Sequence, residues 1–345
     1  MSLKFAVIGC QHAHIGLFIG EMIKLGYECV GLYEPENIKL AEEMCRKFGV
    51  QRIMDVETIW KDETVQIVGC ASVNIDKINV IERCEKFGKN IMIDKPAVCN
   101  RKDLDRLQNV MQRGRIHIGM LLTERFRPSI YTLKQKLDRG ELGEIVHVAM
   151  RKPHKLMPDR RPKWHFSKSQ NGGIIVDLFV HDFDLLRWFT GSEVLRTQGF
   201  VAKNILPEYP DFYDVASLQV VMEEQQTAQF YADWHYAEKS WTWGDCRIFI
   251  TGTEGVAELR LEGDPLVDKS GELFLLVTHQ NEMEQVSLEQ PKTTITEDFL
   301  SRINGQKGLI THEDIWASTC VTIDADEQVD VLNAFTKRAS KNSFE

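Results

Sequence analysis

The sequence predicts an α/β fold in two parts: an N-terminal domain on a parallel sheet, and a C-terminal α+β domain with a largely antiparallel open sheet. The chain has 345 residues, more than most single domains contain. In its first third, short apolar runs alternate with segments of helical spacing, the pattern of βαβ units. Beyond Leu122 the runs alternate apolar and polar residues, as antiparallel strands do. We therefore expect one domain over residues 1–122 and a second over residues 123–345.

The first domain contains five predicted strands, because strands buried on both faces of a parallel sheet are continuously apolar. These apolar runs are residues 4–9, 28–33, 65–71, 90–93 and 116–120. Segments with helical spacing separate them, at residues 15–25, 36–48, 76–87 and 102–113. Strand and helix therefore alternate throughout this part of the chain.

The second domain mixes helical segments with alternating strands. Helices are predicted over residues 129–139, 173–189 and 311–332, and strands over residues 144–150, 216–222, 228–234 and 247–251. The sequence TGTEG at residues 251–255 is a natural hairpin turn. Residues 151–170 are polar, contain three prolines and show little periodicity. We expect an antiparallel sheet with helices on one side.

Composition excludes several classes of protein. The net charge of −9 argues against a nucleic-acid partner, whose phosphates need a basic face. No run of about 18 apolar residues indicates a membrane span. The start, MSLKFAVIG, passes straight into a strand-like run and lacks the pattern of a signal peptide. Eight scattered cysteines without C-x-x-C spacing predict reduced thiols and a cytoplasmic protein.

A glycine loop follows the first strand. Gly9 begins the sequence GCQHAHIG, in which Gln11 and His14 occupy the second and third glycine positions of a G-x-G-x-x-G dinucleotide fingerprint. Alone this signal is weak. Glu34 ends the second strand, where a carboxylate accepts hydrogen bonds from ribose hydroxyls and repels a 2′-phosphate. No arginine follows Glu34 closely, so NAD is favoured over NADP; the alternative is a glutamate that merely begins a turn.

His12 and His14 form an H-x-H pair. A metal site needs more ligands, and none lies nearby in the sequence at zinc-like spacing. We therefore expect no metal here. A histidine that faces a pocket and contacts cofactor or substrate is the favoured interpretation.

Two further motifs contain residues suited to catalysis. Lys95, in Asp94-Lys95-Pro96, follows a predicted strand and can donate to a substrate hydroxyl or carbonyl oxygen; the alternative is a surface turn. In GGIIVDLFVHDFDLLRW, helical spacing places Asp177, His181 and Asp184 on one face. Carboxylates one turn away can orient a histidine and stabilise its protonated form, although a solvated Asp–His pair gives the same pattern.

Together these residues resemble the glucose–fructose oxidoreductase/inositol dehydrogenase/MocA family, over essentially the whole chain. Asp94-Lys95-Pro96 resembles the family's Glu-Lys-Pro, and Gly172, Gly173, Asp177 and His181 match its G-G-x-x-x-D-x-x-x-H pattern. Further matches are Ala71-Ser72-Val73-Asn74 to A-T-P-N, the RFRPS and LDRGELGEI segments, and TGTEG. The departures are Gln11, His14, Val73 and Asp94.

The resemblance implies a Rossmann domain that binds NAD, and Lys95, Asp177 and His181 as the catalytic residues. The implied reaction is hydride transfer between the nicotinamide and a carbinol carbon of a sugar, cyclitol or related polyol. His181 takes the hydroxyl proton, Lys95 holds the oxygen, and Asp177 orients His181 or the substrate. Predicted cofactor contacts are Gly9, Gln11, His12, His14, Glu34, Ala71, Ser72, Asn74 and Lys95.

Other predictions about the ligands are less specific. Candidate substrate contacts are Arg125, Lys152, His154, Trp164, His165 and Asp184. Tyr231, Trp234, Tyr236, Trp241 and Trp243 either stack on a sugar or form part of an oligomer interface. The resemblance implies a homodimer or homotetramer formed through the C-terminal sheet. Two alternatives remain open: a non-catalytic ligand sensor of the same fold, and a reductase of non-sugar carbonyls.

Overall fold

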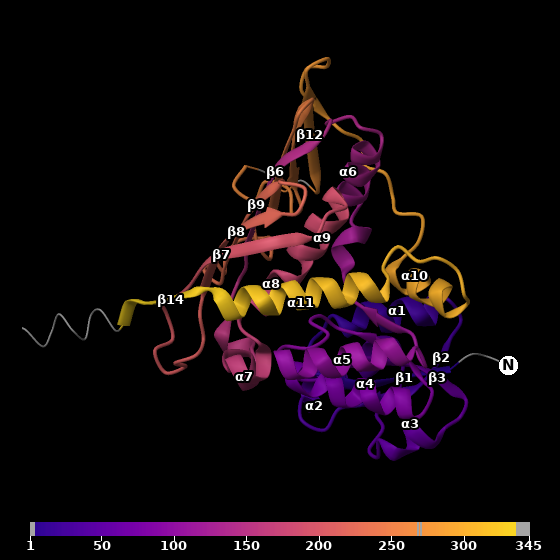
Figure 1. Ribbon diagram of the computed structural model, residues 1–345. Helices are drawn as coiled ribbons and strands as arrows, with labels where there is room; N and C mark the ends of the chain where they lie inside the picture. The colour runs from indigo at the N-terminus through magenta and orange to yellow at the C-terminus, as the bar shows by residue number, and fades with distance from the viewer. Residues whose placement is uncertain (1–3, 268, 270, 336–345) are drawn as a thin grey trace, which may run out of the picture. The chain divides into compact units, whose positions relative to one another are not determined.

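The computed structural model describes residues 4–267, 269 and 271–335 and contains two compact units (Figure 1). The first unit comprises Met1–Leu122, Ser169–Gly172 and Thr293–Cys320. The second comprises Thr123–Lys168, Gly173–Lys292 and Val321–Glu345. The sequence analysis assigned the two later segments of the first unit to the second domain. The start of the chain was predicted to lack a signal-peptide pattern, and its residues 1–3 lie outside the described residues.

The first unit is built on a parallel five-stranded sheet, as predicted. Its strands are β1 (Lys4–Cys10), β2 (Glu28–Tyr33), β3 (Val65–Ala71), β4 (Asn90–Ile93) and β5 (Ile118–Met120). Their order is β2-β1-β3-β4-β5 and every pairing is parallel. The chain leaves β1 toward β2 on one side and later returns to β3 on the other. The carboxyl ends of β1 and β3 therefore form a topological switch point, where open parallel sheets bind ligands.

Helices connect these strands, and a further helix, named last below, lies in the later segment Thr293–Cys320. They are α1 (Ile15–Lys24), α2 (Ile38–Phe48), α3 (Glu57–Lys61), α4 (Lys77–Lys86), α5 (Arg101–Arg113) and α10 (Ile295–Ile303). Asn37 and Asn100 cap α2 and α5 by accepting backbone N–H groups. The sequence analysis missed α10, although Thr294 and Glu297 form a capping box at its start.

His312 is partly buried at the start of α11 (His312–Gln328), and its imidazole Nε2 accepts the N–H of Ile118 at 2.9 Å. Burial, together with Arg302 and His117, lowers the pKa of His312 to about 4. In the unfolded chain this imidazole takes up its proton near pH 6.5.

The free energy of unfolding should therefore fall as the pH drops from 6.5 to about 4, because only the unfolded state binds this proton in that interval. Urea denaturation of wild type and His312→Asn, each at pH 7 and pH 5, measures the effect. The wild type should lose more stability between these two pH values than the variant. An equal loss in both proteins would contradict the prediction.

The second unit is built on a mixed nine-stranded sheet in the order β13-β12-β11-β10-β6-β9-β8-β7-β14. The strands are β6 (Ile145–Pro153), β7 (Val194–Lys203), β8 (Val215–Met222), β9 (Thr227–Asp233), β10 (Arg247–Gly252), β11 (Gly255–Arg260), β12 (Leu273–Thr278), β13 (Glu284–Gln285) and β14 (Asp330–Asn333). Pairing is antiparallel except for β6 with β9 and β7 with β14. The largely antiparallel sheet is confirmed.

Helices pack on one face of this sheet (Figure 1). α8 (Ile174–Leu178) contacts β8 and β9, α9 (Val180–Thr190) contacts β6, and α6 (Pro128–Asp138) contacts β12. The predicted single helix over residues 173–189 is wrong in detail, because Phe179 interrupts it between α8 and α9. The predicted helix over 311–332 is also too long: α11 ends at Gln328, and β14 follows.

Within the described residues, no helix is both long enough and apolar enough to span a bilayer.

Candidate active site

The switch point of the first unit brings together four of the predicted cofactor contacts. Gly9 has φ +83°, and a Cβ at this position would lie 2.5 Å from the backbone nitrogen of Ser72. Only glycine therefore allows β1 and the end of β3 to approach this closely. The N–H of Gln11 donates to the carbonyl of Ala71 at 2.7 Å.

Glu34 is buried, and its carboxylate accepts four hydrogen bonds. Its carboxylate accepts the N–H of Cys10 at 2.6 Å and the Gln11 Nε2 at 2.8 Å. It also accepts the N–H groups of Glu36 at 2.8 Å and Asn37 at 3.0 Å, so it does begin the turn that leads into α2. The Gln11 side chain points toward Glu34. Gln11, which stands at the second glycine position of the fingerprint, therefore connects the loop after β1 to the Glu34 carboxylate.

Arg52 lies beside Glu34, although 18 residues separate them in sequence. A short parallel bridge pairs Arg52 with Leu32, which lies two residues before Glu34. The Arg52 guanidinium donates to the backbone carbonyl of Glu34 at 3.4 Å. The predicted preference for NAD rested on the lack of an arginine soon after Glu34 in the sequence, and Arg52 lies 18 positions further on. An arginine beside the carboxylate that is predicted to contact the ribose would favour NADP, because it can pair with the 2′-phosphate.

NAD(H) should bind more tightly than NADP(H), because Glu34 repels a 2′-phosphate. In Glu34→Ser the repulsion disappears while Arg52 remains. The dissociation constant for NADP(H) divided by that for NAD(H) should therefore fall by about tenfold or more, which corresponds to about 1.4 kcal/mol. Fluorescence titration with both cofactors measures the ratio. The matched control is the double variant Glu34→Ser with Arg52→Ala, in which the increase in NADP(H) affinity caused by Glu34→Ser should disappear. Equal or tighter NADP(H) binding by the wild type would contradict the assignment.

Lys95 follows β4, and the neighbouring Lys77 fixes its backbone. The Lys77 Nζ donates to the carbonyls of Asp94 at 2.6 Å, Lys95 at 3.1 Å and Pro96 at 3.0 Å. Burial lowers the pKa of Lys77, while the Asp94 carboxylate raises it. Lys77 is a positioning residue that the sequence analysis missed, since nothing in the local sequence marks a lysine that binds three remote carbonyls.

Asn74, another predicted cofactor contact, is buried and bonded to the segment Ser169–Gly172. Its Nδ2 donates to the carbonyl of Asn171 at 2.9 Å and to that residue's Oδ1 at 3.0 Å. These bonds attach the late segment to the first unit. The Asn74 side chain therefore has a structural role within this unit.

The Asp94 carboxylate faces both histidines of the H-x-H pair. His12 Nδ1 lies 3.3 Å from Oδ2, and His14 Nδ1 lies 3.3 Å from Oδ1. Burial favours the neutral acid, but His14 and His12 outweigh it and hold the pKa of Asp94 well below its usual range. Our expectation of no metal relied on the lack of a third ligand nearby in sequence. The structure supplies one 80 residues from His14.

The G-G-x-x-x-D-x-x-x-H segment begins at Gly172, the last residue of a first-unit segment, and its remaining residues extend over two helices of the second unit. Gly173 has φ +88° and caps α8, where the N–H of Asp177 donates to the Gly173 carbonyl at 3.0 Å. His181 lies in the first turn of α9 and is buried. Asp177 and His181 are therefore on either side of the interruption at Phe179, rather than on one continuous helix.

Arg161 is a further polar residue of this region that the sequence analysis missed. Its guanidinium lies 5.0 Å from the ring centre of Trp234 and 5.5 Å from that of Trp243, both within cation–π range. Its Nε donates to the Leu156 carbonyl at 3.1 Å. Burial lowers the pKa of Arg161, and the negative charge of Asp177 raises it. Arg161 and Asp177 therefore interact electrostatically.

Two of the candidate substrate histidines contact Trp234. Its buried ring lies 5.8 Å from that of His154 and 5.3 Å from that of His165. The Trp164 ring lies 6.2 Å from that of His165. The structure thus gathers these candidates, from the polar segment and from the end of β9, around one indole.

The other three substrate candidates form buried ion pairs. Arg125 and Asp184 make a two-pronged pair at 2.8 and 2.6 Å, with both side chains 1% exposed. Lys152 donates to Asp182 at 2.8 Å. Each of these charges is neutralised inside the unit, which gives the residues a structural role.

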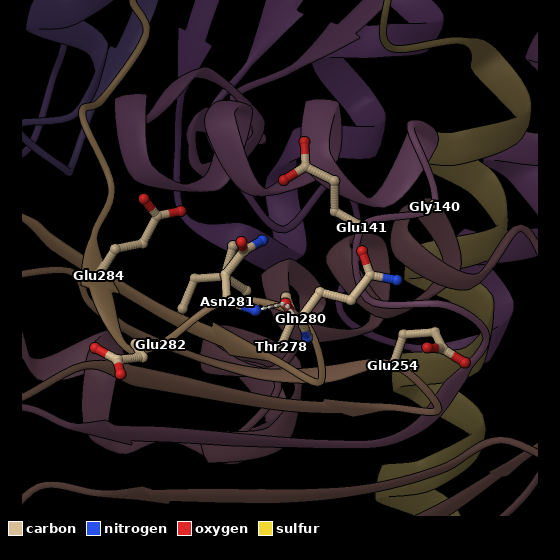
Figure 2. A pocket seen from close by; sticks show the side chains of 9 residues that line it. Gly140, Glu141, Glu254, Thr278, Gln280, Asn281, Glu282 and Glu284 are labelled. Atoms are coloured by element: carbon tan, nitrogen blue, oxygen red, sulfur yellow. Dashed lines mark hydrogen bonds between the residues drawn. The ribbon is translucent and has the colours of Figure 1, made fainter.

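A surface pocket of about 190 Å³ lies elsewhere in the second unit (Figure 2). Its lining is acidic and polar, and comprises Gly140, Glu141, Glu254, Leu276, Thr278, Gln280, Asn281, Glu282 and Glu284. None of these is a predicted site residue. The concentration of glutamates makes the pocket unsuited to an anionic cofactor.

Comparison with known proteins identifies the class of protein. Residues 3–117 match the family described as "Oxidoreductase family, NAD-binding Rossmann fold", and residues 130–258 match the GFO/IDH/MocA C-terminal domain. The chain therefore belongs to the GFO/IDH/MocA family of NAD-binding oxidoreductases. The predicted family, the Rossmann domain and NAD as cofactor are confirmed.

Individual relatives are similar to the chain over different lengths. Myo-inositol 2-dehydrogenase of Thermotoga maritima is 28% identical over 56% of each chain. The scyllo-inositol 2-dehydrogenase (NAD(+)) of Bacillus subtilis is 22% identical over 86% of this chain and 87% of its own length. A structure of levoglucosan dehydrogenase with NADH covers 95% of this chain and 96% of its own, with a TM-score of 0.78 and 18% identity; at that identity it shows the fold alone.

Proposed function

We propose that the protein transfers hydride between NAD(H) and a carbinol or carbonyl carbon of a small polyhydroxylated molecule, a sugar or cyclitol. The observation that best supports this is Lys95 at the carboxyl end of β4, with its backbone fixed by three hydrogen bonds from Lys77. The names of the relatives support the substrate class, since those compared are dehydrogenases of inositols and of a sugar anhydride. The proposed substrate-binding domain is residues 123–345.

The proposed cofactor residues fit NAD. The glycine at position 9 and the carboxylate of Glu34 lie at the switch point and at the end of β2, which suit the diphosphate and the ribose of a dinucleotide. When bound, NAD+ supplies the two-electron acceptor for the hydride. All other steps fall to the side chains of this protein.

In the oxidation direction, a substrate C–H bond and its neighbouring O–H bond both break. The hydride leaves with both electrons of the C–H bond, the carbon becomes a carbonyl, and His181 accepts the hydroxyl proton. Lys95 donates a hydrogen bond to the same oxygen and stabilises its developing negative charge. Asp177 stabilises the protonated form of His181 or positions the substrate. The reduction runs through the same groups in reverse.

The sheet of the second unit supports a proposed dimer or tetramer. Its cross-strand register places Phe200, Phe249 and Val256 on the face opposite to the buried one, where all three are exposed. Exposed apolar residues on one face of a sheet are typical of an interface. Sedimentation velocity measures the oligomeric state directly, and a monomer would contradict this part of the proposal.

A panel of sugars, cyclitols and non-sugar carbonyls, assayed by nicotinamide absorbance in both directions, tests the proposed reaction. Turnover is expected with at least one polyol and NAD+. Turnover confined to non-sugar carbonyls would favour a reductase of that class. Binding of NAD(H) without turnover of any compound would favour a sensor of the same fold.

A further inference from the structure

His12, His14 and Asp94 form a cluster of metal-ligating groups in the first unit. Each offers one ligand atom, and the three atoms lie within 4.8 Å of one another. The Asp94 side chain is 3% exposed, whereas those of His12 and His14 are 33% and 54% exposed. The carboxylate therefore forms the floor of the cluster, and the imidazoles form a rim that solvent reaches.

The spacing of this cluster can accommodate an ion. A tetrahedral ion with ligand bonds of about 2.0–2.2 Å holds its ligand atoms about 3.3–3.6 Å apart. His12 Nδ1 lies 3.3 Å from Oδ2 of Asp94, and His14 Nδ1 lies 3.3 Å from Oδ1; both distances are longer than the roughly 2.7–2.9 Å of a good charge-assisted hydrogen bond. The two imidazole ring centres are 3.9 Å apart. Two protonated rings at that distance repel each other, whereas neutral rings can both bind one cation.

We propose that His12, His14 and Asp94 bind one divalent transition-metal ion, for which Zn²⁺ is the best match. Two imidazoles and one carboxylate are a zinc ligand set that leaves a fourth position open. Carboxylates bring one negative charge to the ion, and histidine bound as the neutral form adds none. The site would therefore retain a net positive charge of about one.

The position of the site indicates what the open coordination position binds. His14 immediately precedes α1, at the end of the loop that begins with Gly9. In a Rossmann domain this loop faces the diphosphate of the dinucleotide. Here two of its three glycines are replaced, so close backbone approach to the phosphates is reduced. We assign the fourth ligand to a diphosphate oxygen of NAD; this assignment rests on the proposed cofactor residues.

The metal site is tested without cofactor. The full chain, without a histidine tag and stripped by chelator, is titrated with Co²⁺ and then with Zn²⁺ as competitor. One Co²⁺ per chain should bind, with the visible absorption of tetrahedral cobalt, and Zn²⁺ should displace it. In His14→Ala and in Asp94→Asn, Zn²⁺ affinity should fall by about 100-fold or more, since loss of an outer partner alone costs about 10–100-fold. The control His147→Ala, at an exposed histidine of β6, should bind as the wild type does.

Absence of stoichiometric Co²⁺ binding, or wild-type affinity in both variants, would overturn the metal site. The phosphate assignment has its own readout, the fluorescence titration of NAD(H) with and without Zn²⁺. Zn²⁺ should tighten NAD(H) binding at least about tenfold in the wild type, and should have no effect in His14→Ala. Unchanged or weakened NAD(H) binding in the Zn²⁺-loaded wild type would overturn the assignment. Failure of the cofactor proposal is distinguishable, because the Co²⁺ titration needs no NAD.

Discussion

Replacing His181 with alanine should lower turnover by about 10²–10⁴-fold, the usual contribution of a general acid–base group. The imidazole is the proposed acceptor of the hydroxyl proton, and its loss leaves only water for that role. The dissociation constant for NAD(H) should stay unchanged, because no contact between His181 and the dinucleotide is proposed. Initial rates with the best polyol of the panel, together with cofactor titration, measure both quantities.

The matched control is His147→Ala. His147 is an exposed histidine of β6 whose Nδ1 contacts the Thr227 hydroxyl at 2.8 Å, and it has no proposed catalytic role. Asp177→Asn should keep the shape of α8 while shifting the pH dependence of turnover, because the negative charge near Arg161 is lost. If His181→Ala retains the turnover of the control, the proposed acid–base assignment is wrong.

The second large effect concerns stability. Removing one partner of the Arg125–Asp184 pair, as in Asp184→Ala, should lower the free energy of unfolding by about 3–5 kcal/mol. Both side chains are 1% exposed, so the change leaves a buried guanidinium without its counter-charge. The guanidinium also lies 5.1 Å from the ring centre of Trp188, which limits its movement toward water. Urea denaturation of the variant and wild type measures the difference.

Two controls separate this effect from others. The double variant Arg125→Met with Asp184→Leu should recover most of the lost stability, because no unpaired charge remains. Asp138→Ala breaks the exposed pair of Lys134 and Asp138 and should cost less than about 1 kcal/mol. A small effect of Asp184→Ala on the free energy of unfolding, combined with a higher KM for the substrate, would instead support the prediction that Arg125 and Asp184 contact the substrate.

Periodicity predicted the five strands of the first unit and β6, β8, β9 and β10 of the second, but it missed β7, β11 and β12. The five continuous apolar runs of the first unit became β1 to β5, because each strand is covered on both sides. β14 was missed, since its four residues obtain their partner only from β7, more than 120 positions away. The break at Phe179 was missed because the apolar pattern continues through it.

The candidate site shows the same limit at the level of side chains. The family motifs identified Lys95, Asp177 and His181, whose neighbours in sequence are informative. Lys77 and Arg161 lie outside any motif, and their interactions depend on backbone carbonyls and indole rings brought together by the fold. A single sequence gives no sign of these contacts.

The bonds from Lys77 have a consequence for how this region can evolve. All three acceptors are main-chain carbonyls, and the ammonium group has three donors to match them. The three hydrogen bonds therefore require no particular side chain at positions 94 and 95, although the Asp94 carboxylate also raises the pKa of the Lys77 ammonium group. Glutamate at position 94, as in the family's Glu-Lys-Pro motif, would leave all three carbonyl acceptors in place. The side chain at position 94 is then free to acquire a new partner without displacing the lysine beside it.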